Sequence, residues 1–233
     1  MNNDKTEIMI CATPHNVKKI NITSLAIDSS IVTCGKSITN LGVYLDETLN
    51  MEHQISKLSQ SLFIEIRKLG HIRPYLSITA AKRIASAFIM FRIDYCNSLL
   101  VGLPAKHINK LQHIENIAAR IVTRTSAKSH QTRHALKHLH WLPVKARIDY
   151  KLACLCHQII SEENNEAPLY LKNILKTYKP DRNLRSSNSI TLKKTKIKLK
   201  NYGEHSFKFA GPHIWNSLPQ NITSLKAVRP FKK

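Results

Sequence analysis

The chain has 233 residues, enough for one domain or two small ones, and its 42% hydrophobic content argues against wholesale disorder. Its 36 Lys and Arg residues against 15 Asp and Glu residues give a formal net charge of +21, which favours a polyanionic partner, nucleic acid before an anionic membrane surface. No stretch suggests a membrane span and no secretory signal is visible, so we expect an intracellular protein of the nucleus or cytoplasm, not a secreted one.

The first 46 residues predict extended structure. Short runs rich in β-branched residues, separated by turn-forming residues at 28–30 and 35–36, predict three or four short strands. The runs are Glu7–Cys11, Ile20–Ile27, Ile31–Thr33 and Asn40–Leu45. Strands so few and short leave unpaired edges that need a neighbour.

From Met51 onward the apolar residues recur with a helical period, which predicts a bundle of amphipathic helices. The first helix ends before Pro74, the second runs from its N-cap Ser77 to Gly102, a third covers about 106–124, a fourth begins near Pro143, and a shorter segment follows residue 168. The apolar stripes are Ile55, Leu58, Leu62, Ile66 and Leu69 in the first helix, Ala81, Ile84, Phe88, Tyr95 and Leu99 in the second, Ile108, Leu111, Ile114, Ala118 and Ile121 in the third, and Ile148, Leu152, Leu155 and Ile159 in the fourth.

The C-terminal region is basic and less regular. Residues 168–233 contain 15 basic and two acidic side chains, a net charge of +13. Thr191–Lys200 alternates between apolar and basic residues, which fits either a half-buried hairpin or a disordered basic arm. Phe207–Leu218 is apolar enough to dock on the bundle. We therefore expect an α+β protein with a small antiparallel sheet in 1–50, a helical bundle in 51–176 and a basic, partly irregular region in 177–233.

One face of the third predicted helix is basic. Lys106, Lys110, His113, Arg120 and Arg124 recur at steps of four, three, seven and four, opposite the apolar stripe. Such a face would bind phosphates in a salt-sensitive manner without sequence preference, or it could be only a solvated helix face. Glu115 is the one acid in this region.

Other reactive side chains predict no chemistry. His130, His134 and His138, with Cys154, Cys156 and His157 further along, match no zinc spacing, so no metal site is expected. The five cysteines are expected to be reduced and mostly packed as small apolar groups. Trp141 and Trp215 are expected in the core rather than stacked on bases.

Four blocks of residues resemble the C-terminal part of reverse transcriptases of non-LTR (LINE) retrotransposons, of the chicken-repeat and jockey group. The blocks are Leu41-Gly42-Val43 with Asp46, Asp94-Tyr95-Cys96-Asn97-Ser98-Leu99-Leu100, Leu139-His140-Trp141-Leu142-Pro143-Val144, and Pro212-His213-Ile214-Trp215-Asn216-Ser217-Leu218-Pro219. The resemblance extends from Lys5 to Pro219. It implies the edge of a palm with its primer grip in the sheet region, a thumb in the helical bundle and a basic C-terminal region.

The resemblance also implies roles for particular residues. Lys5 corresponds to a lysine near the phosphates of the incoming nucleotide, and the hairpin with Leu41 and Gly42 corresponds to the primer grip. Taken together with the basic segments, the residues expected to contact nucleic acid are Lys5, Leu41, Gly42, Lys106, Lys110, Arg120, Arg124, Lys193, Lys194, Lys196 and Lys198.

In this family the two metal-binding aspartates lie upstream of everything matched here, and no Asp-Asp pair occurs in the chain. We therefore expect no catalysis by this chain alone and no cofactor, Mg²⁺ serving only the intact parent enzyme. The expected partner is RNA or DNA, bound without specificity, with no membrane and no small-molecule substrate; the oligomeric state stays open. A protein–protein interaction module and a non-functional translation product are the alternatives.

Overall fold

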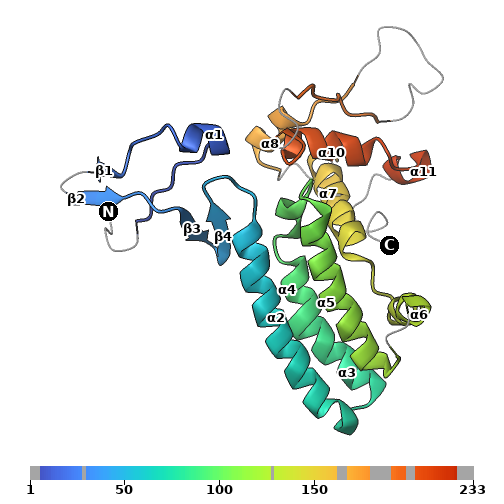
Figure 1. The fold of residues 1–233 in the computed structure, drawn as a ribbon. Coiled ribbons are helices and arrows are strands. Elements are labelled where there is room, and N and C mark those ends of the chain that lie inside the picture. The colour runs from blue at the N-terminus through green and yellow to red at the C-terminus, as the bar shows by residue number, and fades with distance from the viewer. Residues whose placement is uncertain are drawn as a thin grey trace. The chain divides into compact units, whose positions relative to one another are not determined.

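A computed structural model describes residues 6–27, 30–126, 129–161, 167–178, 190–197 and 203–224 (Figure 1). The packing groups the chain into two compact units. Unit 1 contains Met1–Ile93 and Ala105–Ala135, and unit 2 contains Asp94–Pro104 and Leu136–Lys233. The predicted α+β class is confirmed, because small antiparallel sheets at the N-terminus precede a mainly helical remainder. The three-part division at residues 50 and 176 stays a prediction.

Two separate hairpins form the sheet part of unit 1. β1 (Ser24–Ile27) pairs with β2 (Ser30–Thr33), and β3 (Ser37–Asn40) pairs with β4 (Val43–Asp46), both antiparallel. The strand predicted over residues 7–11 was wrong, since only Ile8 forms a bridge there, to Cys34. A short helix that was not predicted, α1 (Pro14–Val17), follows; Thr13 caps it and Pro14 takes its first position.

The run Asn40–Leu45, predicted as one strand, is a hairpin turn followed by most of β4. Asn40 pairs with Val43 across Leu41 and Gly42, whose φ angles are 49° and 77°. Positive φ at both central residues defines a type I′ turn. The backbone twist of this turn matches the right-handed twist of the two strands that it joins.

Asp46 fastens this hairpin to the helix that follows. Its Oδ1 accepts the N–H groups of Thr48 and Asn50 at 3.1 and 3.0 Å, and its Oδ2 accepts the N–H of Met51 at 2.8 Å. One carboxylate thus satisfies three backbone donors where the chain turns into α2 (Glu52–Ile72). Asp46, the last residue of the first resemblance block, is therefore a structural residue.

Three helical segments of unit 1 enclose its core: α2, α3 (Ile78–Ala85) and α5 (Ala105–Thr123). The predicted N-cap is confirmed, because Ser77 Oγ accepts the N–H of Ala80. In α2 the predicted stripe is buried except for Leu58, which is half-buried. The side chains at the centre of this core are Ile55, Leu62 and Leu69 of α2, Ala81 and Ala85 of α3, and Leu111, Ile114, Ala118, Ala119 and Val122 of α5.

The predicted stripe of the second helix was wrong beyond residue 85, because the helix changes its turn size there. Ser86–Met90 is a π-helical segment that joins α3 to α4 (Phe91–Asp94). Wider turns shift every later side chain around the axis. Phe88 is consequently exposed, as are Tyr95 and Leu99 after the helix, while Ile89 and Ile93 are buried. The helix ends before Cys96, which has a φ of 52°, and not at Gly102.

Unit 2 is built around α7 (Val144–Ile160) and α10 (Phe207–Trp215), with α8 (Leu169–Ile174), α11 (Gln220–Thr223) and a 3₁₀ turn at Asn97–Leu100. α7 and α10 pack together; a Cβ on Gly211 would lie only 3.0 Å from Cys156 Sγ, so glycine permits their close approach. Burial raises the pKa of Cys156 to about 12, so this thiol stays protonated. Trp141 and Trp215 are buried, as predicted.

Part of the segment Thr191–Lys200, for which a hairpin or a disordered arm was expected, belongs to the core of unit 2. Leu192 is buried, and its N–H and C=O bond to the Asn216 side chain at 2.9 and 2.8 Å. Trp215 Nε1 donates to the carbonyl of Ile190, and Thr177 forms an antiparallel bridge with Leu192. Within residues 190–197 the disordered-arm alternative is therefore wrong.

One further helix, α6 (Ser129–Leu139), was not predicted.

Candidate nucleic-acid interface

The basic face predicted for the third helix exists in α5. Lys106, Lys110, His113 and Arg120 all lie within this helix, on the side opposite the buried Leu111. Lys110 and His113 are exposed and Arg120 is half-buried. Lys106 makes an exposed ion pair with Glu52 at 3.6 Å, which contributes little free energy.

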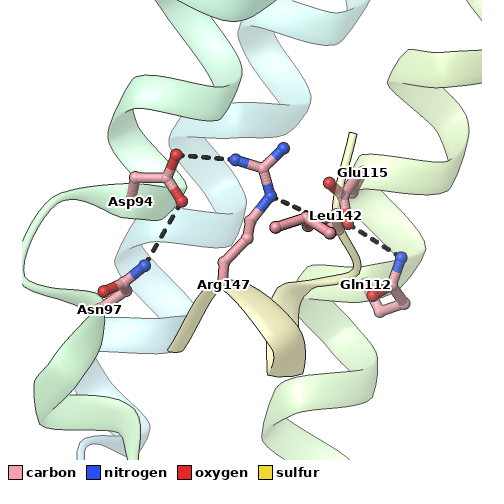
Figure 2. Close-up of polar contacts among 6 residues, drawn as sticks. All are labelled: Asp94, Asn97, Gln112, Glu115, Leu142 and Arg147. Carbon is pink, nitrogen blue, oxygen red and sulfur yellow. Dashed lines mark hydrogen bonds and ion pairs between the residues drawn. The ribbon is translucent and has the colours of Figure 1, made fainter. Parts of the chain in front are cut away.

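Glu115, which was expected to interrupt this face, lies on the other side of α5. Its side chain is fully buried, and its Oε2 accepts a hydrogen bond from Gln112 Nε2 at 3.0 Å (Figure 2). Because Glu115 is the one acidic residue of α5, the exposed side of the helix carries no carboxylate. This arrangement concentrates the positive potential of the face.

Arg124 departs from the prediction. It follows the end of α5 with a φ of 53°, so it does not continue the helical face. Its Nη2 donates to the carbonyl oxygens of Arg73 and Pro74, both at 3.1 Å. Arg124 thereby ties the end of α5 to the 3₁₀ turn η2 (Arg73–Tyr75) that follows α2.

The other residues predicted to bind nucleic acid are placed as follows. Leu41 and Gly42 form the tip of the β3–β4 hairpin in unit 1; Leu41 is exposed, and nothing lies within 4 Å of a Cβ placed on Gly42. Lys193, Lys194 and Lys196 are exposed in unit 2. Lys5 and Lys198 lie outside the described residues.

An arginine pocket that was not predicted adjoins the α5 face within unit 1. It is an open pocket of about 600 Å³, lined by Gly70, Arg73, Pro74, Arg120, Ile121, Arg124 and Thr125. Arg73 is only 7% exposed. Its position, four residues after Leu69, continues the buried stripe of α2, and a charged residue in that register was the sequence signal for this site.

A second open pocket in unit 1 combines cations with an aromatic ring. Lys82, Arg83 and Phe91 line it with Thr79, Ser86 and Ala87, and its volume is about 570 Å³. Phe91 is 68% exposed. Exposed rings beside cations are the combination with which proteins stack and hold single-stranded bases.

The second and third resemblance blocks meet in unit 2 at a polar cluster. Arg147 Nη1 pairs with Asp94 Oδ2 at 2.7 Å, and Arg147 Nε donates to the carbonyl of Leu142 at 2.7 Å (Figure 2). Asn97 Nδ2 donates to Asp94 Oδ1 at 3.4 Å. The side chain of Arg147 is 14% exposed, so this polar cluster stabilises the packing of unit 2 rather than forming a binding surface.

Burial raises the pKa of Asp94 above its ordinary value, and the nearby charges of Arg147 and Lys151 and the hydrogen bonds from Arg147 and Asn97 oppose this only in part. The folded state therefore binds the proton more tightly than the unfolded chain does. We expect the contribution of Asp94 to the unfolding free energy to decrease as pH rises from the ordinary Asp value of about 4 through the raised folded-state pKa.

The carboxyl ¹³C shift of Asp94 as a function of pH measures this pKa, and Arg147→Gln should raise it further. Asp94→Asn should remove the corresponding pH dependence of stability, whereas Asp149→Asn on α7 serves as a matched control. A folded-state pKa at or below the ordinary value would contradict the expectation.

Among the described residues, no group of three His, Cys, Asp or Glu side chains is placed to hold a metal ion. His134 and His138 are exposed on α6, whereas Cys154, Cys156 and His157 are buried. No helix in the described ranges is long and apolar enough to cross a membrane.

The chain has no match among protein-family models, curated proteins or solved structures.

Proposed function

We propose that this protein binds RNA or DNA without sequence preference, through the basic face of α5. The observation that carries the proposal is that Lys106, Lys110, His113 and Arg120 share one side of a rigid helix whose single acid, Glu115, is buried on the other. Cations arranged in this way neutralise successive phosphates and release counterions. Nothing in the sequence suggests an element that reads base edges in a groove, so phosphate contacts dominate.

Removing two of these cations should weaken the salt dependence of binding. Lys106→Gln with Lys110→Gln leaves the apolar side of α5 intact, so the fold should survive. The slope of log K against log salt should flatten by about 1.8 units with a duplex and by about 1.4 units with a single strand, at roughly −0.9 and −0.7 for each phosphate that a lysine neutralises. Fluorescence anisotropy with a labelled single strand and a labelled duplex, at several salt concentrations, measures the slope.

A matched control is Lys57→Gln with Arg67→Gln, which removes two exposed cations from α2. The control should keep most of the parental slope. Equal flattening in both double variants would show that only the net charge matters, and an unchanged slope in the α5 variant would make its basic face merely solvated.

The exposed lysines of unit 2 are a separate contribution to test. A truncation before this segment would delete Leu192 and Trp215 from the core, so it would confuse binding with folding. Replacing Lys193, Lys194 and Lys196 with glutamine leaves Leu192 in place and isolates their contribution to the slope.

The proposal includes descent from the C-terminal part of a non-LTR reverse transcriptase, which comprises the end of the palm, the primer grip, the thumb and the C-terminal region. Three of the four resemblance blocks lie in unit 2. They supply buried residues of its interior, Trp141, Val144 and Trp215, and two members of the polar cluster, Asp94 and Asn97. Blocks that are far apart in sequence but pack in one unit are what a shared ancestral fold would produce. This clustering supports the proposed origin.

The chain by itself should extend no primer. Polymerase chemistry needs carboxylates that hold two metal ions at the primer terminus, and the sequence contains no adjacent Asp pair. The measurement is nucleotide incorporation on an RNA template with Mg²⁺ or Mn²⁺. Template-dependent incorporation above a buffer control would refute this part of the proposal.

A second candidate function is the binding of a protein partner through the β1–β2 hairpin. Ile31 is 77% exposed and Leu25 is also exposed on this isolated two-stranded sheet. Such an edge can pair with another strand. Failure of the chain to bind either nucleic acid at low salt would favour this function over the first.

A further inference from the structure

We propose that the arginine pocket of Arg73, Arg120 and Arg124 is a seat for one phosphate group, supplied by the nucleic-acid backbone that runs along α5. The inference rests on the proposed function and specifies where a single phosphate is held. Inorganic phosphate offers the same chemistry, so the experiment separates the two sources.

The first argument is the charge of the pocket. Three of its seven lining residues are arginines and none is acidic. No salt bridge among the described residues involves Arg73, Arg120 or Arg124. Buried charges in proteins are normally paired, so a nearly buried guanidinium with only carbonyl partners is unusual.

The second argument is how Arg73 is held. Its Nε donates to the carbonyls of Ile121 and Val122 at 3.0 and 3.1 Å, its Nη2 to Val122 at 2.7 Å, and its Nη1 to Leu76 at 2.7 Å. These carbonyls orient the guanidinium but do not neutralise it. The C-terminal end of α5 supplies about half a negative charge, against three cations. Burial and the nearby charge of Arg124 both lower the pKa of Arg73, which is the signature of uncompensated positive charge.

The third argument is preorganisation. Arg124 is tethered through Nη2 to two carbonyls, which leaves its Nε and Nη1 able to donate to a ligand. Two guanidinium groups fixed before the ligand arrives lose little side-chain entropy on binding. Guanidinium groups match the tetrahedral oxygens of phosphate through paired N–H donors, which a single ammonium cannot do.

The fourth argument is continuity with the basic face of α5. Arg120 belongs both to that face and to the pocket. Lys110 and Arg120 are ten residues apart, about 15 Å along the helix axis. A nucleic-acid strand whose phosphates contact Lys110 and His113 would therefore bring a later phosphate of the same strand to the pocket.

Gly70 allows the positive charge of the pocket to be opposed without replacing an arginine. It lies in α2 on the wall of the pocket, and no atom lies within 4 Å of a Cβ placed on it. Gly70→Glu would place a carboxylate among the arginines, and Gly70→Gln places an amide of the same size there. Both residues favour helix more than glycine does, so the fold should hold. Gln60→Glu, at an exposed position of α2, makes the same one-unit change in net charge away from the pocket.

The full chain is tested with a labelled oligothymidylate and, separately, with inorganic phosphate against chloride at equal ionic strength. Gly70→Glu should weaken oligothymidylate binding about tenfold and flatten the salt slope by about one unit. Gly70→Gln and Gln60→Glu should stay within about threefold of the parent. Phosphate should protect the parent and both controls against thermal unfolding more than chloride does, and Gly70→Glu should lose this protection.

The outcomes separate the pocket from the proposed function. Protection by phosphate that Gly70→Glu abolishes, in a chain that binds no oligothymidylate, would keep the phosphate seat but overturn both the backbone source and the proposed function. A salt slope that flattens in the Lys106→Gln, Lys110→Gln variant but keeps its parental value in Gly70→Glu would overturn the pocket and keep the proposed function. Equal weakening in Gly70→Glu and Gln60→Glu would also overturn the pocket, since charge alone would then explain the result.

Discussion

Replacing Arg73 with methionine should lower the unfolding free energy of unit 1 by about 3 kcal/mol or more. The Arg73 guanidinium donates to three carbonyl groups, and two of them, those of Ile121 and Val122, belong to the last turn of α5. Carbonyls at a helix C-terminus have no helical donor, and a hydrogen bond from a charged group contributes about 1.5–3 kcal/mol. Methionine fills a similar volume but leaves the Val122 carbonyl without the two donors it has from Arg73.

Hydrogen exchange of the α2 and α5 amides during urea titration reports this change. Both tryptophans of the chain, Trp141 and Trp215, belong to unit 2, so tryptophan fluorescence does not report on unit 1 directly. Arg67→Met, at an exposed position of the same helix, should change stability by less than about 0.5 kcal/mol. If Arg73→Met is no more damaging than Arg67→Met, the carbonyl contacts of Arg73 have no energetic role.

Replacing Trp215 with alanine should lower the unfolding free energy of unit 2 by about 4 kcal/mol. The side chain is 1% exposed and belongs to a cluster that includes Cys156, Leu175 and Leu192. Truncating a buried aromatic ring to alanine removes its burial and leaves a cavity, at a cost of about 3–5 kcal/mol. The indole also donates to the carbonyl of Ile190 at 2.8 Å, a bond that alanine cannot make.

Trp215→Phe separates packing from hydrogen bonding. Phenylalanine keeps an aromatic ring but removes the donor to Ile190, so we expect a smaller decrease than for alanine, about 2 kcal/mol. The fluorescence of Trp141 in a urea titration follows unit 2 in both variants. A decrease below about 1 kcal/mol for Trp215→Ala would show that the region around Leu192 is not a cooperative part of the core.

The long amphipathic helices were predictable because their burial is regular. In α2 and α5 a steady spacing of Leu and Ile places one face inward, so periodicity alone located both helices and the basic side of α5. Ser77 was recognisable as a cap because its hydroxyl has a local partner, the N–H of Ala80.

In three places the local geometry differs from what the sequence pattern predicted. The π-helical turn at Ser86–Met90 breaks the 3.6-residue period, so the stripe through Phe88 could not be extrapolated. The Leu41–Gly42 turn lacks the Asn-Gly or Asp-Gly pair that marks type I′ hairpins. In α6 the buried residues after Gln131 are Thr132, Ala135, Leu136 and Leu139, of which only the two leucines are large and apolar, so the apolar pattern is short.

The arginine pocket was missed for a different reason. Arg120 and Arg124 were assigned to one helical face because they are four residues apart, but α5 ends between them. Arg73 comes from a segment about fifty residues earlier, and only the folded chain brings it to the carbonyls of Ile121 and Val122. The position of Arg73 in the buried stripe of α2 indicated a buried cation, but contacts between distant segments leave no periodic signal in a sequence that would identify its partners.

The chain passes three times between the two units, because each unit is assembled from two separate stretches of sequence. Neither unit can therefore be expressed as one uninterrupted fragment: residues 1–93 alone would lack α5, and residues 136–233 alone would lack the 3₁₀ turn at Asn97–Leu100. During synthesis 39 residues, 105–143, separate the segment Asp94–Pro104 from α7, the helix with which its 3₁₀ turn packs. The four stretches alternate between the two units, so no circular permutation makes either unit continuous, and the units are best examined with point variants in the whole chain rather than with deletions.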